Sequence, residues 1–236
     1  MSTSAPTISV VIPVYNNQNT LVELTKQLTG LFSQHNLSFQ IIYVNDASKD
    51  QSAALLKKLQ HENEQIACIY HEINRGQHLA ILSGLKYANG DYVVVMDADL
   101  QDNPLHIYDM YKSISSENEA VFILRRGIYQ SKMRMFTSWG IKSIVRNLVG
   151  LHHKAGSFFL MSQSILQNVV NLASNCKYPY ITIIAAHCAG HISYVAANRS
   201  KPLGDSNYTF KKRLSAAYKA LYCAVYCKTI AKSIRG

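Results

Sequence analysis

The sequence predicts an α/β fold: a mostly parallel central sheet flanked by helices and followed by a basic helical segment. Three observations predict it. Apolar runs of strand length alternate with segments of helical spacing through the first 125 residues. One run, Tyr92–Met96, is strongly apolar, which is typical of a strand buried on both faces. The strand–helix order favours parallel pairing, because a crossover helix joins parallel neighbours.

The elements of the first half follow from local signals. Leucines at helical spacing predict a helix over Thr20–Gln34, and Asn89-Gly90 ends a later one. Ser48 and Asp50 are candidate N-caps. The expected strands are Ile8–Val14, Phe39–Val44, Ile66–Tyr70, Tyr92–Met96 and Val121–Leu124, and the expected helices are Thr20–Gln34, one through Leu55–Leu59, Gly76–Ala88 and one that begins at Pro104.

The second half is less regular. From Phe210 onward, apolar residues alternate with Lys and Arg at helical spacing, so a basic helix is expected there. The other expected elements are a basic helix over Ser131–Leu148, a strand over Phe158–Met161, an apolar helix over Ile181–Ala189 and a strand over Ile192–Ala197.

Charge is distributed unevenly along the 236 residues, whose net charge is +10. Residues 1–120 carry seven Lys and Arg against 13 Asp and Glu, whereas residues 121–236 carry 17 against one, Asp205. The first half therefore suits an acidic site, and the second half suits an anionic partner. Phosphates and a membrane surface are favoured. We expect no nucleic acid, because no aromatic–basic strand platform or recognition helix is evident.

Cysteine usage and hydropathy bear on location. The five Cys show no paired spacing, which indicates free thiols in a reducing cytosol rather than a disulfide framework. The polar first residues run directly into a strand, so we expect no signal peptide. No stretch reaches 18 uninterrupted apolar residues, so we expect no complete transmembrane helix.

Polar clusters follow three of the expected strands, at the edge of the sheet where such folds bind ligands. Asp97 and Asp99 come directly after a buried strand, and Gln101 adds an amide oxygen. Hard divalent cations such as Mn²⁺ or Mg²⁺ bind oxygen ligands of this kind and bridge to phosphates. The two acids are also compatible with capping the helix that begins at Pro104. The other clusters, residues 13–17 and 45–50, are compatible with ordinary turns and caps.

Four segments resemble inverting glycosyltransferases of family 2, which have the GT-A fold with a Rossmann-like sheet: VVIPVYNN (10–17), VNDASKDQS (44–52), NRGQHLAILSGLKYANGDY (74–92) and VVVMDADLQDNP (93–104). The resemblance covers about the first 125 residues. The run from Asn74 to Pro104 looks like the polyprenyl-phosphate sugar transferases, of the dolichol-phosphate mannose synthase type and the bacterial undecaprenyl-phosphate type. It implies transfer of a sugar from a nucleotide-sugar to a polyprenyl phosphate, with UDP favoured over GDP.

The resemblance also implies roles for individual residues. Asp97, Asp99 and Arg125 would be catalytic, and Asp97, Asp99 and Gln101 would bind Mn²⁺ or Mg²⁺. The residues implied for the nucleotide-sugar are Pro13, Tyr15, Asn16, Asn45, Asp46, Gln77, Asp97 and Ala98, and those implied for phosphate or acceptor are Arg125, Arg134, Ser138, Arg199 and Ser206.

The sequence departs from the family at three positions. Asn45 stands where an Asp is usual, so that a charge is lost while hydrogen-bond recognition is kept. Ser157 and Phe159 stand where the family has an acid and an Arg. Whatever that Arg contributes elsewhere, this chain must achieve differently.

The near-absence of acids in the second half bears on the acceptor. A hydroxyl acceptor needs a general base, yet Asp205 is the only acid after Glu119. An ionised phosphate is its own nucleophile, so a lipid phosphate is favoured. The alternative is a family 2 enzyme that acts on a glycan hydroxyl in cell-surface polysaccharide synthesis. His187 and His191 are its candidate bases, although a structural role is favoured for both.

The family pattern divides the chain into a GT-A catalytic domain, 1–207, and a basic amphipathic juxtamembrane helix, 208–236. Such a helix lies on an anionic membrane, with Tyr at the interface and Lys among the headgroups, or packs on the catalytic domain. The expected location is the cytoplasmic face of the cell membrane, reached peripherally or through transmembrane helices outside this chain. The identity of the sugar and a possible homo-oligomer stay open.

Overall fold

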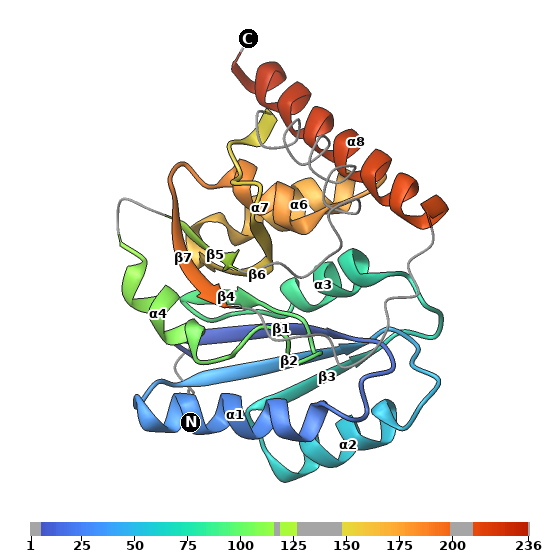
Figure 1. The fold of residues 1–236 in the computed structure, drawn as a ribbon, viewed down its shortest axis with the longest axis vertical. Helices are drawn as coiled ribbons and strands as arrows, with labels where there is room; N and C mark the ends of the chain where they lie inside the picture. The colour runs from blue at the N-terminus through green and yellow to red at the C-terminus, as the bar shows by residue number, and fades with distance from the viewer. Residues whose placement is uncertain (1–5, 116–118, 127–147, 199–209, 236) are drawn as a thin grey trace.

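The computed structural model describes residues 6–115, 119–126, 148–198 and 210–235. Within them a seven-stranded sheet lies between two layers of helices (Figure 1). The strands are β1 (Ile8–Val14), β2 (Phe39–Asn45), β3 (Ile66–Tyr70), β4 (Tyr92–Val95), β5 (Ala120–Arg126), β6 (Ala155–Ser162) and β7 (Ile192–Asn198). The helices are α1 (Leu21–Gln34), α2 (Ser52–Glu62), α3 (Gln77–Leu85), α4 (His106–Ser113), α6 (Gln163–Asn175), α7 (Ile181–Cys188) and α8 (Phe210–Arg235).

The strands are ordered β3-β2-β1-β4-β6-β5-β7. β1 pairs in parallel with β2 and β4, and β2 with β3, whereas β6 is antiparallel to both β4 and β5. β7 is parallel to β5. Six strands therefore point one way and β6 points the other, which confirms the mostly parallel sheet. The place of β6 between β4 and β5 was not predicted, because strand order depends on pairing between distant segments.

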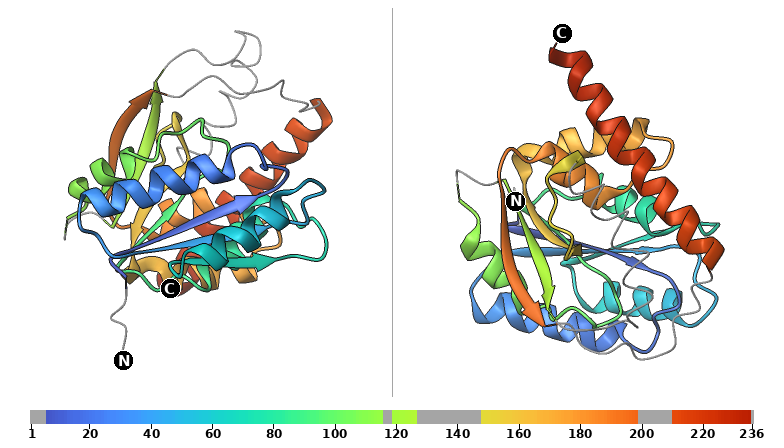
Figure 2. Two further views of the ribbon diagram at one scale, coloured as in Figure 1. Left: turned by 90° about the horizontal axis from the view of Figure 1, so that it is seen from below. Right: turned by 45° about the horizontal axis from the view of Figure 1, so that its top comes forward.

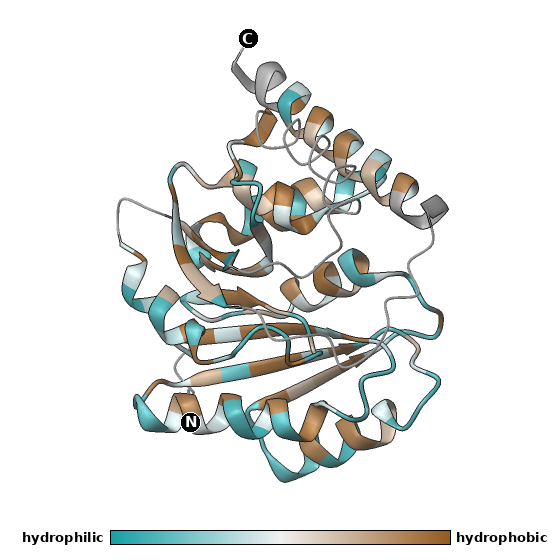
Figure 3. Ribbon diagram, viewed as in Figure 1, coloured by the Kyte–Doolittle hydropathy of each residue, from teal (hydrophilic) through white to brown (hydrophobic). Residues whose placement is uncertain are grey.

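Both faces of the sheet are buried, as the apolar strands predicted. Successive residues of β1 alternate between the two sides: Val10 and Ile12 belong to a core with α1, α2 and α4, and Val11 to a core with α3, α6 and α7. Figure 3 shows the strands as largely hydrophobic and the helices as mixed. Burying apolar side chains on both faces holds the strand ends in fixed positions.

Most expected elements are confirmed, with small shifts at their ends. The helix expected from Pro104 begins at His106, because Leu105 occupies the N-cap position. Ser48 and Asp50 do not occupy the N-cap of α2, which is Gln51. α6 was missed, because its apolar residues are interspersed with Asn, Gln and Ser. Of the expected basic helix, residues 131–147 lie outside the described residues.

α8 is the basic helix expected at the end of the chain. It lies across the side of the molecule that carries α7 and packs against that helix (Figure 2). Cys223, Ala224 and Cys227 on its inner face are buried, whereas Leu214 and Tyr218 are exposed. All five Cys are free thiols, as the sequence predicted. Among the described residues, no helix combines the length and apolar character needed to cross a bilayer.

Phe159, which stands where the resemblance implies an Arg, belongs to the core. Its ring is fully buried and stacks on Phe122 of β5, with centroids 5.0 Å apart. Phe159 therefore supports the pairing of β5 with β6 from within the apolar core.

Truncation of this ring is expected to destabilise the protein. Phe159→Ala should lower the free energy of unfolding by about 3–5 kcal/mol, because a buried aromatic is replaced by a cavity. Chemical denaturation measures the change. Val22→Ala on the exposed face of α1 is the control, with an expected change within about 0.5 kcal/mol. Equal stability of the two variants would show that Phe159 is not part of the packed core.

Candidate active site

The carboxyl ends of β1, β2 and β4 meet at one edge of the sheet, as the sequence predicted. The loop after each strand holds one non-glycine residue with a left-handed backbone: Asn16 (φ 57°), Ala47 (φ 56°) and Leu100 (φ 57°). For a residue with a Cβ atom, this conformation costs about 1–2 kcal/mol. Strain of this kind concentrates at binding and catalytic sites, where the surroundings hold it in place. Three such positions at one edge mark that edge as a candidate site.

The loops after β1 and β2 are joined by hydrogen bonds. The Asn16 backbone N–H donates to Ser48 Oγ over 3.0 Å, and Asn16 Oδ1 accepts from the Lys49 N–H over 2.8 Å. Asp50 accepts from the Gln18 N–H over 3.1 Å. Asn16, Ser48 and Asp50 therefore fix the two loops against each other. Asp50 Oδ1 also accepts from the Ser52 N–H at the start of α2 over 3.0 Å, so Asp50 satisfies a donor of that helix although Gln51 occupies the N-cap position.

A pocket of about 540 Å³ opens between the loops that follow β1, β2 and β3. Of the residues predicted to bind the nucleotide-sugar, Tyr15 and Asn45 line it. The Tyr15 side chain is exposed, so its ring is open to stacking by a planar group. Asn45 Oδ1 accepts from the Ser48 N–H over 3.2 Å and shapes the turn. Pro13 lies within β1, opposite Val44 of β2.

Asp46 lies beside the pocket and is only 2% exposed. Its carboxylate accepts hydrogen bonds from the backbone N–H groups of Arg75, over 2.8 Å, and Gly76, over 2.7 Å. His71 Nδ1 lies 2.8 Å from the same carboxylate, and His71 Nε2 lies 2.9 Å from Ser83 Oγ. Most of the acceptor capacity of Asp46 is used within the protein. These contacts favour a structural role for Asp46, which supports the segment that leads into α3. A contact between Asp46 and the nucleotide, which the resemblance implies, stays a prediction.

The sequence did not indicate His71 or Ser83. Each is an isolated polar residue, and only the pairing of β2 with β3 brings His71 next to Asp46. Gly76, at φ 90°, occupies the N-cap of α3 in a conformation that favours glycine. The bend there directs the Gln77 side chain toward β4.

α3 is anchored on its other side by His78. Its ring packs on Tyr180, with centroids 3.9 Å apart, and its Nδ1 atom accepts from the Ile181 N–H over 3.4 Å. Burial, together with the charge of Lys219, lowers the pKa of His78 to about 4. The ring is therefore neutral at pH 7 and can accept this bond, which ties the start of α3 to α7.

Asp97 and Asp99 lie directly after β4. Asp97 accepts from Gln77 Nε2 over 2.6 Å and from Ser157 Oγ over 2.7 Å. Asp99 Oδ1 accepts from the Gln101 N–H over 3.0 Å. The Ala98 carbonyl accepts from Thr20 Oγ1 over 2.6 Å, which ties this turn to the loop after β1.

The two acids do not cap α4. The N-cap of that helix is Leu105, which has no side-chain cap bond, and the Leu105 N–H donates to Asn103 Oδ1 over 3.0 Å. The contacts at the start of α4 therefore favour Asn103, rather than Asp97 or Asp99, as the side chain that supports it.

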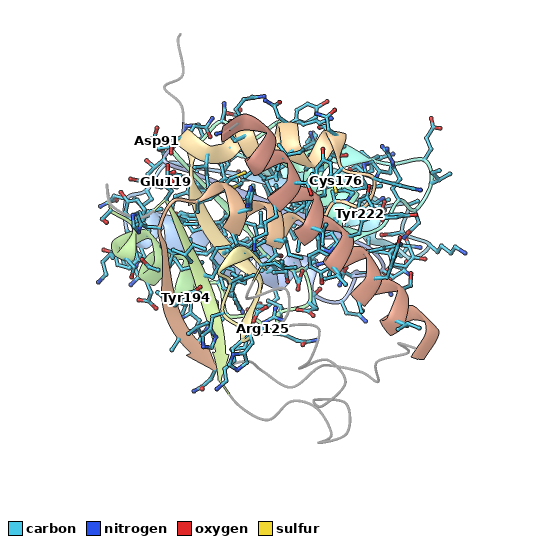
Figure 4. The ribbon with its side chains drawn as sticks, turned by 90° about the horizontal axis from the view of Figure 1, so that it is seen from above. Asp91, Glu119, Arg125, Cys176, Tyr194 and Tyr222 are labelled. Atoms are coloured by element: carbon cyan, nitrogen blue, oxygen red, sulfur yellow. The ribbon has the colours of Figure 1, made fainter. Side chains whose placement is uncertain are left out.

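Arg125, near the end of β5, brings a positive charge to this edge. Its Nη2 atom lies 2.7 Å from Asp102 Oδ2 and 3.8 Å from Asp97 Oδ2. In Figure 4, Arg125 lies at the opposite end of the sheet from Asp91 and Glu119, which precede β4 and β5. Arg125 thus joins the predicted acids in space, and Asp102 and Ser157 are members of the cluster that the prediction missed.

The charges around Asp97 are unbalanced. Burial raises the pKa of its carboxyl, and the charges of Asp99 and Asp102 raise it further, whereas Ser157 and Arg125 lower it. An additional cation would relieve this imbalance. The oxygen donors fit a hard divalent ion. Among the described residues, no three His, Cys, Asp or Glu side chains form a metal-binding group, so ligand or water oxygens would have to complete the coordination.

Four residues implied for phosphate or acceptor binding, namely Arg134, Ser138, Arg199 and Ser206, lie outside the described residues.

Removing the charge of Asp46 is expected to loosen the segment before α3. Asp46→Asn places an amide NH₂ against backbone N–H donors and should cost about 2–3 kcal/mol of stability. The Arg75 and Gly76 amides should also lose protection from hydrogen exchange. Asp109→Asn, on the exposed surface of α4, is the control and should change neither quantity. Unchanged protection of Arg75 and Gly76 in Asp46→Asn would refute the supporting role.

Removing the charge of Asp97 is expected to have the opposite effect on stability. The pKa of Asp97 is higher in the folded protein than its ordinary value of 3.8, so folding favours the protonated form. The contribution of Asp97 to stability therefore falls as the pH rises from about 3.8 through its folded pKa. In EDTA at pH 7, Asp97→Asn should unfold at a higher denaturant concentration than the wild type. Asp91→Asn is the control, and a lower midpoint for Asp97→Asn would contradict the assignment.

Comparison with known proteins identifies the family. Residues 9–170 match the model of glycosyl transferase family 2. The undecaprenyl-phosphate 4-deoxy-4-formamido-L-arabinose transferase of Proteus mirabilis (strain HI4320) is 30% identical over 218 residues, which cover 91% of this chain and 66% of the relative. The chain thus spans slightly less than two thirds of the length of such curated relatives.

Two solved structures share the fold. Mannosyl-3-phosphoglycerate synthase from Rubrobacter xylanophilus matches with a TM-score of 0.66 at 16% identity, over 93% of this chain and 73% of that one. Glucosyl-3-phosphoglycerate synthase from Mycobacterium tuberculosis, in complex with Mn²⁺, UDP and glucosyl-3-phosphoglycerate, matches with a TM-score of 0.63 at 16% identity, over 94% and 80%. These likenesses confirm the predicted GT-A fold. The family model, which covers more than half of the sequence, establishes that this chain belongs to glycosyl transferase family 2.

Proposed function

We propose that this protein is an inverting, metal-dependent glycosyltransferase that moves a sugar from a nucleotide-sugar, a UDP-sugar rather than a GDP-sugar, to a polyprenyl phosphate. One observation carries the proposal: Asp97, Asp99 and Arg125 meet at the same edge of the sheet as the pocket lined by Tyr15 and Asn45. Family membership and relatives named for transfer to undecaprenyl phosphate support the same reaction class.

The pocket suits the nucleoside part of the donor. Tyr15 offers an aromatic face for the base, and Asn45 offers a polar side chain at the pocket wall. The diphosphate would then extend toward Asp97 and Arg125. The preference for UDP rests on the DADLQ resemblance, and UDP occurs in the solved complex of glucosyl-3-phosphoglycerate synthase.

Asp97, Asp99 and Gln101 would hold a Mn²⁺ or Mg²⁺ ion. When bound, such an ion neutralises the charge that develops on a departing nucleoside diphosphate. Arg125 would contribute a second positive charge to the diphosphate oxygens. Gln77 and Ser157 orient the Asp97 carboxylate through the hydrogen bonds of 2.6 and 2.7 Å, so that it need not reorganise on binding.

The acceptor is proposed to be a phosphate because of what the second half lacks. Apart from Asp205, no Asp or Glu follows Glu119 in the sequence, so the second half offers almost no carboxylate that could deprotonate a hydroxyl. In the proposed reaction, an ionised phosphate oxygen forms the new bond to the anomeric carbon. The bond from that carbon to the nucleoside diphosphate breaks, and the electron pair leaves with the diphosphate. Arg134, Ser138, Arg199 and Ser206 remain candidates for binding this phosphate.

α8 is proposed to lie on the cytoplasmic face of the cell membrane, as the juxtamembrane segment of a catalytic domain over residues 1–207. Leu214, Tyr218 and Val225 are exposed on it, and Lys219 and Lys228 lie on the same helix. Apolar and aromatic side chains beside lysines suit an anionic interface. α8 also packs on α7. Contact with an anionic membrane and packing on the catalytic domain are therefore compatible with one position of the helix.

The assay for this function uses the purified protein with Mn²⁺, a series of UDP- and GDP-sugars and a short polyprenyl phosphate. A glycosylated lipid phosphate should form with at least one donor. Asp99→Ala should lower kcat by about 100-fold or more, because charge stabilisation at the diphosphate is lost. Asp109→Ala on exposed α4 is the control and should keep wild-type turnover. Product with an oligosaccharide acceptor alone would defeat the lipid-phosphate assignment in favour of a glycan hydroxyl.

A further inference from the structure

The Arg125 guanidinium lies in a small site between the ends of three strands. We call this site, which is formed by Asp102, Gly156 and Ser157, its seat. Arg125 is the penultimate residue of β5, and its backbone N–H donates to the Lys154 carbonyl over 3.2 Å. Its Nη2 atom reaches Asp102 at 2.7 Å and Ser157 Oγ at 3.4 Å. The guanidinium therefore lies over the start of β6, between the ends of β4 and β5.

Gly156 forms the floor of this seat. The pairing of β5 with β6 shifts register between Phe122 and Leu124, which sets Leu124 opposite Ala155. A Cβ atom at Gly156 would come too close to the guanidinium, 2.6 Å from Arg125 Nε and 2.8 Å from Nη2. The observed position of Arg125 is thus available only because residue 156 has no side chain.

A second observation shows that the seat constrains Arg125. Within the described residues, the buried Nε atom of Arg125 has no hydrogen-bond partner. A buried N–H without a partner costs about 1–3 kcal/mol. The Asp102 contact holds the guanidinium there despite this cost, because the ion pair is short, at 2.7 Å, and the Asp102 side chain is only 4% exposed.

The seat sets the distance between Arg125 and the acid that follows β4. The β4–β6 register continues so that Ser157 bonds Asp97, and Nη2 then lies 3.8 Å from Asp97 Oδ2. That distance is longer than a hydrogen bond, so this carboxylate does not saturate the guanidinium. An incoming anion can be shared between Arg125 and a cation held by Asp97.

We propose that Gly156 and Asp102 are positioning residues, which seat Arg125 beside Asp97 so that its guanidinium binds the diphosphate of the donor. This inference rests on the proposed function. It adds a role for a residue without a side chain and for an acid outside the expected metal ligands.

The test is Gly156→Ala, which displaces the guanidinium and changes no charge. The clash falls on the end of a flexible side chain, so the fold should be retained. Calorimetry should show UDP binding about 10–100-fold weaker than in the wild type, both in EDTA and with Mn²⁺, because charge-assisted hydrogen bonds are lost. Binding of uridine, which has no phosphate, should be unchanged. The matched control is Gly30→Ala in α1, where an added Cβ meets nothing within 4 Å.

The double variant tests whether Gly156 acts through Arg125. In an Arg125→Ala background, Gly156→Ala should weaken UDP binding no further, because the displaced group is already absent. An additive loss would mean that the added methyl acts on something else, and would overturn the proposal.

Asp102 supplies an independent variant in case Gly156→Ala does not fold. Asp102→Leu removes the carboxylate that holds the Arg125 guanidinium and should weaken UDP binding. Asp102→Asn keeps an oxygen acceptor for the guanidinium and should retain most of the wild-type affinity for UDP. Net charge alone predicts the reverse, since losing an acid beside an anion site tightens anion binding. Unchanged or tighter binding in Asp102→Leu would overturn the positioning role. If the wild type binds neither UDP nor UDP-sugars, the proposed function fails first, and the two failures are distinguishable.

Discussion

The site depends on one constraint, the antiparallel insertion of β6 between β4 and β5. Because β6 points against its neighbours, its first residues lie where β4 and β5 end. Ser157 thereby meets the first acid after β4, and Gly156 lies against the Arg125 side chain near the end of β5. A parallel strand in this position would bring its final residues to the same edge and would connect to the chain quite differently. The acid pair and Arg125 face one another because of this reversal.

The same edge concentrates charge that the fold does not fully balance. Asp97 and Asp102 lie near the Arg125 guanidinium, and the charge of Asp99 also acts on Asp97. Asp97 is held by hydrogen bonds, while burial disfavours its ionised form. Groups arranged in this way lower the stability of the isolated protein and would favour the joint binding of a cation and an anion in the proposed function. The left-handed residues Ala47 and Leu100 add backbone strain at the same place. The packing of the two hydrophobic cores has to compensate for the unbalanced charge and for the backbone strain.

The sequence predicted much of this fold because the relevant signals are local. Strands appeared as apolar runs, and the acids after β4 stood out by their spacing. The features that could not be predicted from the sequence depend on contacts between distant segments. Nothing near Gly156 indicates that an arginine lies over it, and nothing near His71 indicates Asp46. α6 was missed for a different reason: its polar composition concealed the spacing of Ile165 and Val169.

The Asp46 network connects features that seem separate along the chain. Asp46 lies beside the pocket, it holds Gly76 at the start of α3, and Gln77, the next residue, bonds Asp97. The pocket wall and the acid pair therefore share one support that is ordered during folding. A ligand that spans both regions would meet a surface already in its bound arrangement, and little conformational entropy would be lost on association. On this basis, much of the affinity for such a ligand would be determined before the ligand arrives.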